Sequence, residues 1–230
     1  MWITIMALRA VWGLPLYVEA GSTKLLFDTG PDPQVLEDNA RSLKLNLSAL
    51  SAVVISHEHG DHIGGLPLIA RLKPGLGVYA PSHTGPSFKS EIEKLGLRLL
   101  EVDEPKELFP GIATTGPLYG PPYEQALMIY VAHRGLIILT GCSHPGIDKI
   151  IEYAHNLTGL PVYAVIGGFH LVGADDSRLR EVALTFKRYG LREVYPIHCT
   201  GDRARRYFKE VLGEVYEDGH VGIVVEIGAP

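Results

Sequence analysis

The stretch that decides the fold is "ISHEHGDHIGG", residues 55–65. It begins at the last residue of the largely apolar run "LSALSAVVI", residues 47–55. It places four side chains that can bind metal within a few positions: His57, His59, Asp61 and His62. Imidazole nitrogens and carboxylate oxygens suit Zn²⁺ and other first-row divalent ions. In a turn after a strand, the first two histidines would reach one point and the aspartate and third histidine a second. A lone histidine would more simply belong to a polar loop, but this spacing predicts two neighbouring ions that share one hydroxide.

Length and composition favour one soluble enzyme-sized domain spanning residues 1–230. The chain is 46% hydrophobic and 20% charged, which is enough for a substantial core. Its formal charge of −5 argues against nucleic-acid and membrane-surface partners, which select basic surfaces, and favours a small-molecule substrate. No apolar run has the length of a membrane span, and the start "MWITIMALRA" lacks the features of a signal peptide, so we expect a cytoplasmic protein.

The side-chain inventory adds two smaller inferences. Two cysteines, Cys142 and Cys199, are too few for a disulfide framework, and a reducing compartment would leave them as thiols or as neighbours of a metal. Asparagine and glutamine are scarce, which hints at a thermophilic source.

The chain alternates strands and helices throughout, which predicts an α/β protein. We expect a hairpin around Gly21 and Ser22, and a second hairpin that turns at "HRG", residues 133–135. Further strands are expected at residues 52–56, 77–80, 162–168, 193–197 and 221–227, and helices at residues 32–45, 62–73, 87–94, 146–157, 177–189 and 202–212. Glycines and prolines mark element ends and give no domain boundary.

"HEHGDH" resembles the HxHxDH signature of the metallo-β-lactamase superfamily, and the similarity extends over nearly the whole chain. "LLFDTG" is similar to the strand that carries a buried aspartate behind the ligands, here Asp28. Downstream, "LTGCSHPG", "VIGGFHL" and "YPIHCTG" resemble the branch of 7,8-dihydropterin-6-methyl-4-(β-D-ribofuranosyl)aminobenzene-5′-phosphate synthases. The resemblance implies a four-layer αββα sandwich with two divalent ions at one edge, for which zinc is our first expectation and iron and manganese are alternatives.

One departure from the superfamily pattern changes the expected ligands. Members usually have a histidine upstream of a "TGD" turn whose aspartate bridges both metals, but residues 85–131 contain no histidine and the turn here reads "TGC". We therefore predict His144 as the third ligand of the first ion, beside His57 and His59. The alternative is a polar residue at a helix start, with Ser143 as cap and Pro145 in the first turn. Cys142 is expected behind the ligands, with ligation as a thiolate as the alternative.

The second ion would take Asp61, His62 and His198, the last of which ends the apolar strand "EVYPI". Cys199 is expected to pack behind this set. His170 follows another apolar strand and is predicted, with Asp61, to act in catalysis. Arg203 opens the helix after "HCTGD" and could bind a substrate anion, while Asp202 is expected to cap that helix.

The predicted activity is metal-dependent chemistry on a phosphorylated small molecule. If the branch applies, a dihydropterin methyl diphosphate loses diphosphate and joins a ribofuranosylaminobenzene phosphate. The closest alternative is hydrolysis of a phosphoester or lactone by a metal-activated hydroxide that Asp61 positions. A redox di-iron domain typically shows HxExDH, whereas His59 stands at the middle position here. A non-catalytic metal-binding domain would be favoured if the loop "GPLYGPPYEQ", residues 116–125, closed the site.

Overall fold

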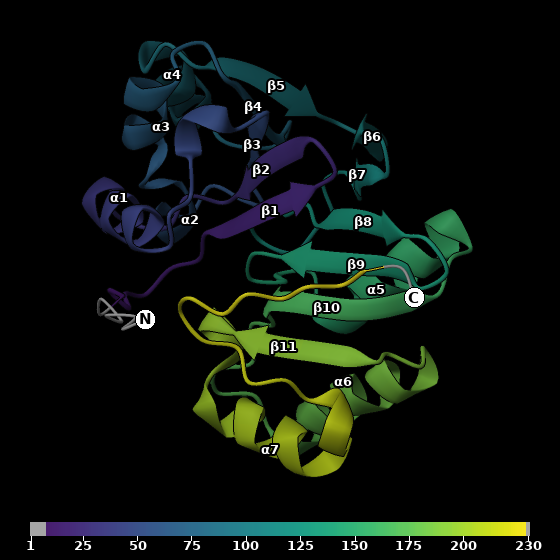
Figure 1. Ribbon diagram of the computed structural model, residues 1–230. Helices are drawn as coiled ribbons and strands as arrows, with labels where there is room; N and C mark the ends of the chain where they lie inside the picture. The colour runs from purple at the N-terminus through teal and green to yellow at the C-terminus, as the bar shows by residue number, and fades with distance from the viewer. Residues whose placement is uncertain (1–7, 229–230) are drawn as a thin grey trace.

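The structure is a computed structural model, and it describes residues 8–228 (Figure 1). Its first sheet begins with the predicted hairpin, in which Ala20 pairs with Thr23 across Gly21 and Ser22. The strand order is β1-β2-β3-β4-β5, and all neighbours after the antiparallel β1–β2 pair run parallel. The strands are β1 (Leu16–Ala20), β2 (Thr23–Phe27), β3 (Ala52–Val54), β4 (Gly77–Pro81) and β5 (Arg98–Val102).

The second sheet has the order β11-β10-β9-β8-β7-β6. Its parallel half is formed by β9, β10 and β11, and its antiparallel half includes the predicted hairpin between β8 and β9. The strands are β6 (Lys106–Phe109), β7 (Ile112–Thr114), β8 (Leu127–Val131), β9 (Gly135–Thr140), β10 (Val162–Gly168) and β11 (Glu193–Ile197).

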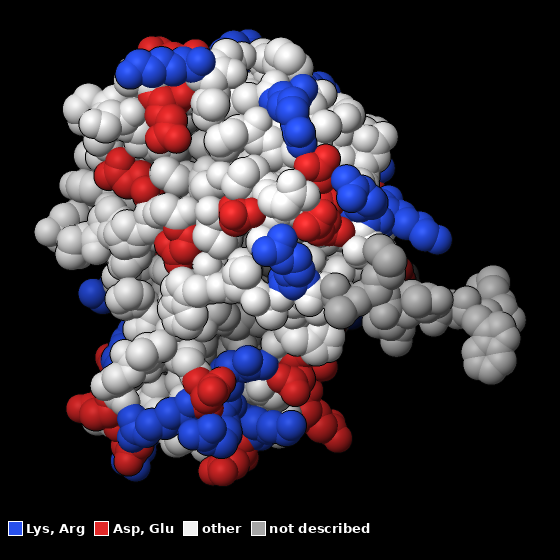
Figure 2. All heavy atoms as spheres, turned by 90° about the vertical axis from the view of Figure 1, so that its left-hand side faces the viewer, with Lys and Arg blue, Asp and Glu red and all other residues white. Residues whose placement is uncertain are grey.

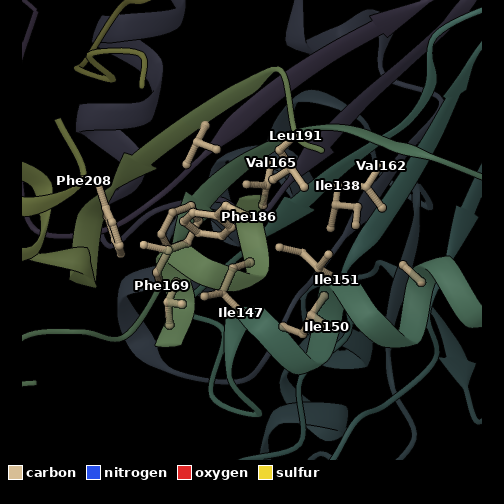
Figure 3. Close-up of a cluster of buried hydrophobic side chains, with 14 of the residues drawn as sticks. Ile138, Ile147, Ile150, Ile151, Val162, Val165, Phe169, Phe186, Leu191 and Phe208 are labelled. Carbon is tan, nitrogen blue, oxygen red and sulfur yellow. The ribbon is translucent and has the colours of Figure 1, made fainter. Parts of the chain in front are cut away.

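Alternation along the strands divides the core into three layers. On β2, Leu25 and Phe27 point between the two sheets, whereas Leu26 points to the helices outside, because successive strand residues face opposite sides. The outer face of the first sheet packs against α1 (Pro33–Ser42), α3 (Leu66–Leu72) and α4 (Pro86–Lys94). The outer face of the second packs against α5 (Ile147–Thr158), α6 (Asp176–Arg188) and α7 (Asp202–Leu212) (Figures 1 and 3). The αββα sandwich predicted from the sequence is therefore confirmed.

The helix expected over residues 62–73 is broken in two. It forms α2 (Gly60–Ile63) and α3, separated by Gly64 and Gly65. A Cβ at Gly64 would overlap the backbone of Pro31, and one at Gly65 would overlap the carbonyl of Thr29. The two glycines thus let the chain between α2 and α3 lie directly on the segment that follows β2.

Three local expectations were wrong. Residues 221–227 form no strand, since their backbone pairs with no neighbouring strand among the described residues, and Val224 is 75% exposed. Helix α7 starts at Asp202 itself, so Gly201 and not Asp202 is its cap. Helix α5 starts at Ile147, beyond Ser143 and Pro145, and the Ser143 hydroxyl donates to the carbonyl of Gly168 instead (2.6 Å).

Short elements complete the chain. Strands β5, β6 and β7 were not expected, because three to five residues are too few to show a clear period. Three 3₁₀ turns are η1 (Leu47–Ala49), η2 (His198–Thr200) and η3 (Gly213–Val215). Within residues 8–228, none of the helices combines the length and the apolar character that crossing a membrane requires.

Candidate metal centre

The predicted ligands gather where four strands end. His57 follows β3, Cys142 and His144 follow β9, His170 follows β10 and His198 follows β11. The carboxyl ends of neighbouring parallel strands meet at one edge of a sheet, so side chains distant in sequence converge there. This edge lies to the left in Figure 1, where the arrowheads of β9, β10 and β11 point, and Figure 2 shows it face on.

The first group of ligands surrounds one point. His57 Nε2 lies 3.1 Å from His59 Nδ1, and the ring of His144 is 4.7 Å from that of His57 and 5.0 Å from that of His59. Two nitrogens bound to one tetrahedral Zn²⁺ at about 2.0 Å lie about 3.3 Å apart, so the measured gap suits two ligands of the same ion. The Nε2 atom of His144 is buried without a hydrogen-bond partner in the described chain. Buried polar atoms are normally hydrogen-bonded, so a free lone pair here suits a nitrogen that binds a cation.

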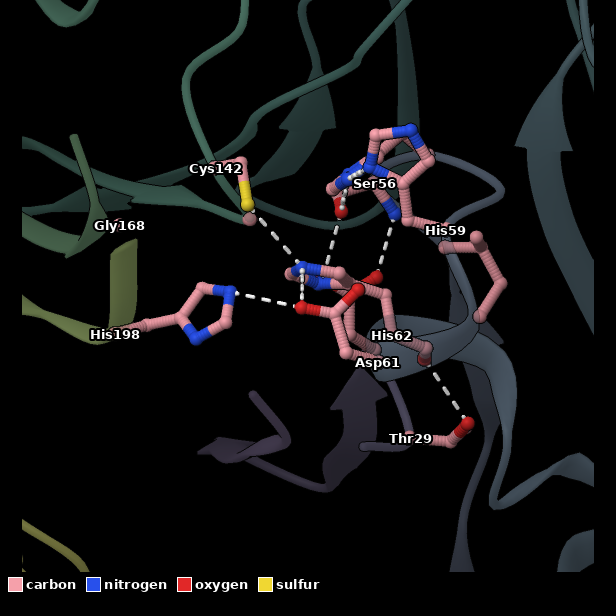
Figure 4. A network of polar contacts seen from close by, with 12 residues as sticks. Thr29, Ser56, His59, Asp61, His62, Cys142, Gly168 and His198 are labelled. Atoms are coloured by element: carbon pink, nitrogen blue, oxygen red, sulfur yellow. Dashed lines mark hydrogen bonds and ion pairs between the residues drawn. The ribbon is translucent and has the colours of Figure 1, made fainter. Parts of the chain in front are cut away.

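The second group lies beside the first (Figure 4). Asp61 Oδ2 is 3.1 Å from His198 Nε2 and 3.6 Å from His62 Nε2. His198 Nε2 is buried and makes no hydrogen bond of good geometry within residues 8–228. The structure thus brings together the two predicted sets, His57, His59 and His144, and Asp61, His62 and His198, and the donor types of both fit divalent metal ions.

Cys142 lies between these two groups. Its Sγ and the ring nitrogens of His57 and His144 lie within 4.8 Å of one another. The same holds for its Sγ and the ring nitrogens of His62 and His198. Its distance to His62 Nε2 is 3.3 Å. The structure therefore places the thiol among the ligands, whereas the sequence suggested a position behind them.

Burial keeps most of the imidazoles neutral. It lowers the pKa of His57 far below its ordinary value, and the neighbouring imidazoles of His62 and His144 lower it further. Burial and nearby histidines likewise lower the pKa of His144 and of His198 to about 4. Burial also lowers the pKa of His62, but the Asp28 carboxylate outweighs it and raises the pKa above the ordinary value. Neutral rings offer lone pairs to a cation without first losing a proton.

Asp28 orients two of the ligands from behind. This fully buried carboxylate accepts hydrogen bonds from the Ser56 amide (2.7 Å), the Ser56 hydroxyl (2.6 Å) and His62 Nδ1 (2.7 Å). Because the Ser56 hydroxyl donates to Asp28, it accepts from His57 Nδ1 at 2.9 Å. Both rings are thereby assigned the tautomer with Nδ1–H, which leaves Nε2 free to bind metal.

Glu124 holds the turn that carries Cys142 and His144, and the sequence interpretation did not find it. Its Oε1 accepts from the amides of Gly141, Cys142 and Ser143 at 2.9–3.0 Å, and its Oε2 accepts from the amide of His144 at 2.8 Å. Burial raises the pKa of Glu124, and the amides of His144 and Ser143 oppose this rise. The signal in the sequence is the pair of polar residues "EQ", Glu124 and Gln125, directly before the apolar strand "ALMIYV".

Several site residues are held in an uncommon backbone conformation. Six non-glycine residues of the described chain have positive φ, and four of them belong to this centre: Asp28, Ser143, His170 and His198, at 50–61°. Each such residue costs about 1 kcal/mol, so the surrounding contacts must stabilise it. Strain of this kind is concentrated at the edge where the predicted ligands gather.

The remaining predicted residues lie around the ligands. Cys199 is buried, with its Sγ 3.5 Å from the carbonyl oxygen of Cys142. His170 is exposed, its ring lies 4.4 Å from that of His144, and it forms a third close group with the two thiols. Arg203 pairs with Asp176 (2.6 Å) and with the carbonyl of Ala174, so a substrate contact by Arg203 stays a prediction. Trp12, which the sequence interpretation overlooked, places its ring 4.8 Å from that of His198.

The sequence profile described as the metallo-beta-lactamase superfamily matches residues 14–166. The chain belongs to this superfamily. Superfamily members bind divalent metals, which agrees with the ligand groups described above.

Named relatives agree with this membership. The chain is 29% identical to a 7,8-dihydropterin-6-methyl-4-(beta-D-ribofuranosyl)-aminobenzene-5'-phosphate synthase of Methanocaldococcus jannaschii, over 93% of this chain and 89% of that protein. An uncharacterized protein of the same organism is 27% identical over 94% and 93% of the two chains.

Solved structures show the same fold. A metal-dependent hydrolase of the beta-lactamase superfamily superposes with a TM-score of 0.78 and 26% identity, covering 92% of this chain and 94% of that one. The metallo-beta-lactamase fold protein YhfI of Bacillus subtilis has a TM-score of 0.68 and 19% identity, covering 92% and 91%. The resemblance inferred from "HEHGDH" and the motifs downstream is confirmed at the level of superfamily and fold.

Proposed function

We propose that the protein is a dinuclear metal-dependent enzyme that acts on a phosphorylated small molecule. The observation that carries this proposal is the pair of residue groups at one sheet edge, each with a buried nitrogen that has no hydrogen-bond partner among residues 8–228. His57, His59 and His144 would hold one ion, and Asp61, His62 and His198 the other, with Zn²⁺ as the first choice and iron or manganese as alternatives.

Bound divalent ions supply Lewis-acid stabilisation of negative charge on phosphate oxygens and lower the pKa of water. The side chain of Asp61 is 23% exposed, so its carboxylate can also orient a water molecule or a substrate hydroxyl at the mouth of the site. His170, exposed beside His144, would move a proton to or from the reacting group. The ring of Trp12 lies 4.8 Å from that of His198, beside the second group.

A groove beside the centre supports a substrate with an extended anionic part. It has a volume of about 630 Å³, and its lining includes His144, His170, Leu171, Val172 and Lys149. Lys149 has no carboxylate within ion-pair distance in the described chain, whereas Arg178, which also lines the groove, is paired with Asp148 and Glu181. Figure 2 shows no broad basic area at this edge of the described chain, and charges of both signs gather at its lower end, near α6 and α7. Such a surface fits a small molecule better than a nucleic acid.

In the reaction we favour, a dihydropterin methyl diphosphate loses diphosphate, and the dihydropterin is joined through its methyl carbon to a ribofuranosylaminobenzene phosphate. The support is the similarity to the synthase of Methanocaldococcus jannaschii over 93% of this chain. In this reaction a carbon–oxygen bond to diphosphate breaks, a bond to the second substrate forms, and the second substrate loses a proton. Hydrolysis of a phosphoester or lactone is the alternative, and it is supported by the likeness to a metal-dependent hydrolase.

The test is a direct comparison of both reactions on protein loaded with Zn²⁺, Fe²⁺ or Mn²⁺. We expect diphosphate release that requires both transfer substrates, and little hydrolysis of phosphoesters and lactones. Hydrolysis in the absence of the second substrate would favour the alternative. If the loaded protein turned over neither set, a non-catalytic or redox metal-binding domain would replace both.

A further inference from the structure

Cys142 occupies a position that both ligand groups share. Its Sγ lies close to His57 and His144 on one side and close to His62 and His198 on the other. No other described residue belongs to both of these groups. A single atom in this place can contact two ions at once.

The backbone around Cys142 fixes this position. Glu124 accepts the amide hydrogens of Gly141, Cys142 and Ser143, so the turn cannot rotate without leaving buried amides unpaired. A Cβ at Gly141 would overlap the Ser56 hydroxyl, which leaves the turn no room to shift toward β3. Cys142 is 4% exposed, so its thiol is confined among the imidazoles.

Charge gives a second reason for a thiolate here. The first ligand group consists of three imidazoles and brings no negative charge, and the second brings only the carboxylate of Asp61. Two divalent ions a few ångströms apart repel each other strongly in a buried site unless an anion lies between them. A thiolate of Cys142 would supply that anion to both ions.

We propose that Cys142 binds both metal ions as a bridging thiolate, a role that rests on the proposed dinuclear function. When the ions bind, the Sγ–H bond breaks, the proton leaves to solvent and two sulfur–metal bonds form, without any change of oxidation state. A shared soft ligand favours Zn²⁺, Fe²⁺ or Co²⁺ over Mn²⁺ and Mg²⁺ at this centre.

Cys199 provides the matched control. It is the only other cysteine of the chain, it is also buried, and it approaches the carbonyl oxygen of Cys142 from the turn after β11, at the same edge of the sheet. Cys199 belongs neither to the set with His57 and His144 nor to the set with His62 and His198. Its thiol lies close only to Cys142 and His170. Any absorption from a thiolate bound to metal must therefore come from one of these two residues.

The experiment is a Co²⁺ titration of metal-free protein, followed by the near-ultraviolet thiolate-to-cobalt charge-transfer band and by competition with a chelator. We expect the parent and Cys199→Ser to bind two equivalents, with a band that grows through both. Cys142→Ser should lose the band and weaken each equivalent at least about tenfold, which corresponds to about 1.4 kcal/mol. Cys142→Asp should recover part of the affinity without the band, because a carboxylate can also bridge.

Other outcomes overturn the assignment. A band that stops growing after one equivalent would make Cys142 a terminal ligand, and a band lost in Cys199→Ser would assign the thiolate to the neighbour. A parent that binds two Co²⁺ ions without the band would refute the bridge while leaving the dinuclear function intact. Fewer than two equivalents in the parent would refute the dinuclear function itself. The readings on the parent do not depend on whether a variant folds.

Discussion

At the scale of single residues, Asp28 determines how two ligands present their nitrogens. In Asp28→Asn an amide group replaces one accepting oxygen, so either the Ser56 amide or both the Ser56 hydroxyl and His62 Nδ1 lose their acceptor. We expect metal affinity to fall about 10–100-fold, as it does when a buried partner of a metal-bound histidine is removed. Competition with a chelator measures this. The control is Asp32→Asn, which should match the parent because asparagine can also accept from Val35 at the start of α1.

His144 is the residue at which this chain departs most from its superfamily. His144→Ala removes one of three nitrogens from the first group, and we expect metal affinity to fall at least about tenfold, or about 1.4 kcal/mol. His133 lies in the turn before β9, at the opposite end of that strand from His144, so His133→Ala should bind metal as the parent does. Equal metal affinities of His144→Ala and the parent would remove His144 from the ligands and make His170 the candidate.

At the scale of elements, the turn after β9 depends on the carboxylate of Glu124. In Glu124→Gln the amide nitrogen cannot accept, so either the amide of His144 or the amides bound at Oε1 lose their acceptor. We expect the free energy of unfolding to fall by about 1–3 kcal/mol, together with metal affinity. Denaturant unfolding of the metal-free protein checks the first effect. Glu152→Gln, at an exposed position of α5, should change neither quantity.

Helices α5 and α6 are joined by Asp148 and Arg178, which gives a pH dependence. Burial raises the pKa of Asp148, but the hydrogen bond from Arg178 outweighs it, so the pKa lies below the usual 3.8. A lowered pKa in the folded state means that the pair stabilises the protein above pH 3.8 and loses this effect as the pH falls through the lowered pKa.

Asp148→Asn should therefore cost about 1–2 kcal/mol of unfolding free energy near pH 7, and less below pH 3.8. Urea unfolding of metal-free protein over this range measures it. A difference between variant and parent that stayed constant with pH would contradict the ion pair as its source.

Elements with a clear period were predictable, and those set by distant contacts were not. The hairpin around Gly21 and helix α1 follow from local alternation and amphipathic spacing. The break between α2 and α3 depends on Gly64 touching the backbone of Pro31, a contact that no local pattern encodes. Residues 221–227 have the apolar pattern of a strand but pair with no strand in the described chain. A strand also needs a neighbour with a free edge, and the sequence of the segment alone does not show one.

At the scale of the whole molecule, the gathering of the predicted ligand residues could be foreseen because strand ends in one sandwich meet at one edge. "HEHGDH" indicated the chemistry, and His144, Cys142 and His198 each follow an apolar strand that the sequence shows. Glu124 was missed because its role is to accept hydrogen bonds from four amides of the turn after β9, and that turn comes into contact with it only in the folded chain. The same holds for the position of the Cys142 thiol, which depends on how the two sheets face each other.

The measurement that tests this account most directly is the metal content of reconstituted protein, with anomalous diffraction to place the ions. We expect about two transition-metal ions per chain, one among His57, His59 and His144 and the other among Asp61, His62 and His198. No bound ion after reconstitution, a single ion, or ions bound away from these six side chains would contradict it.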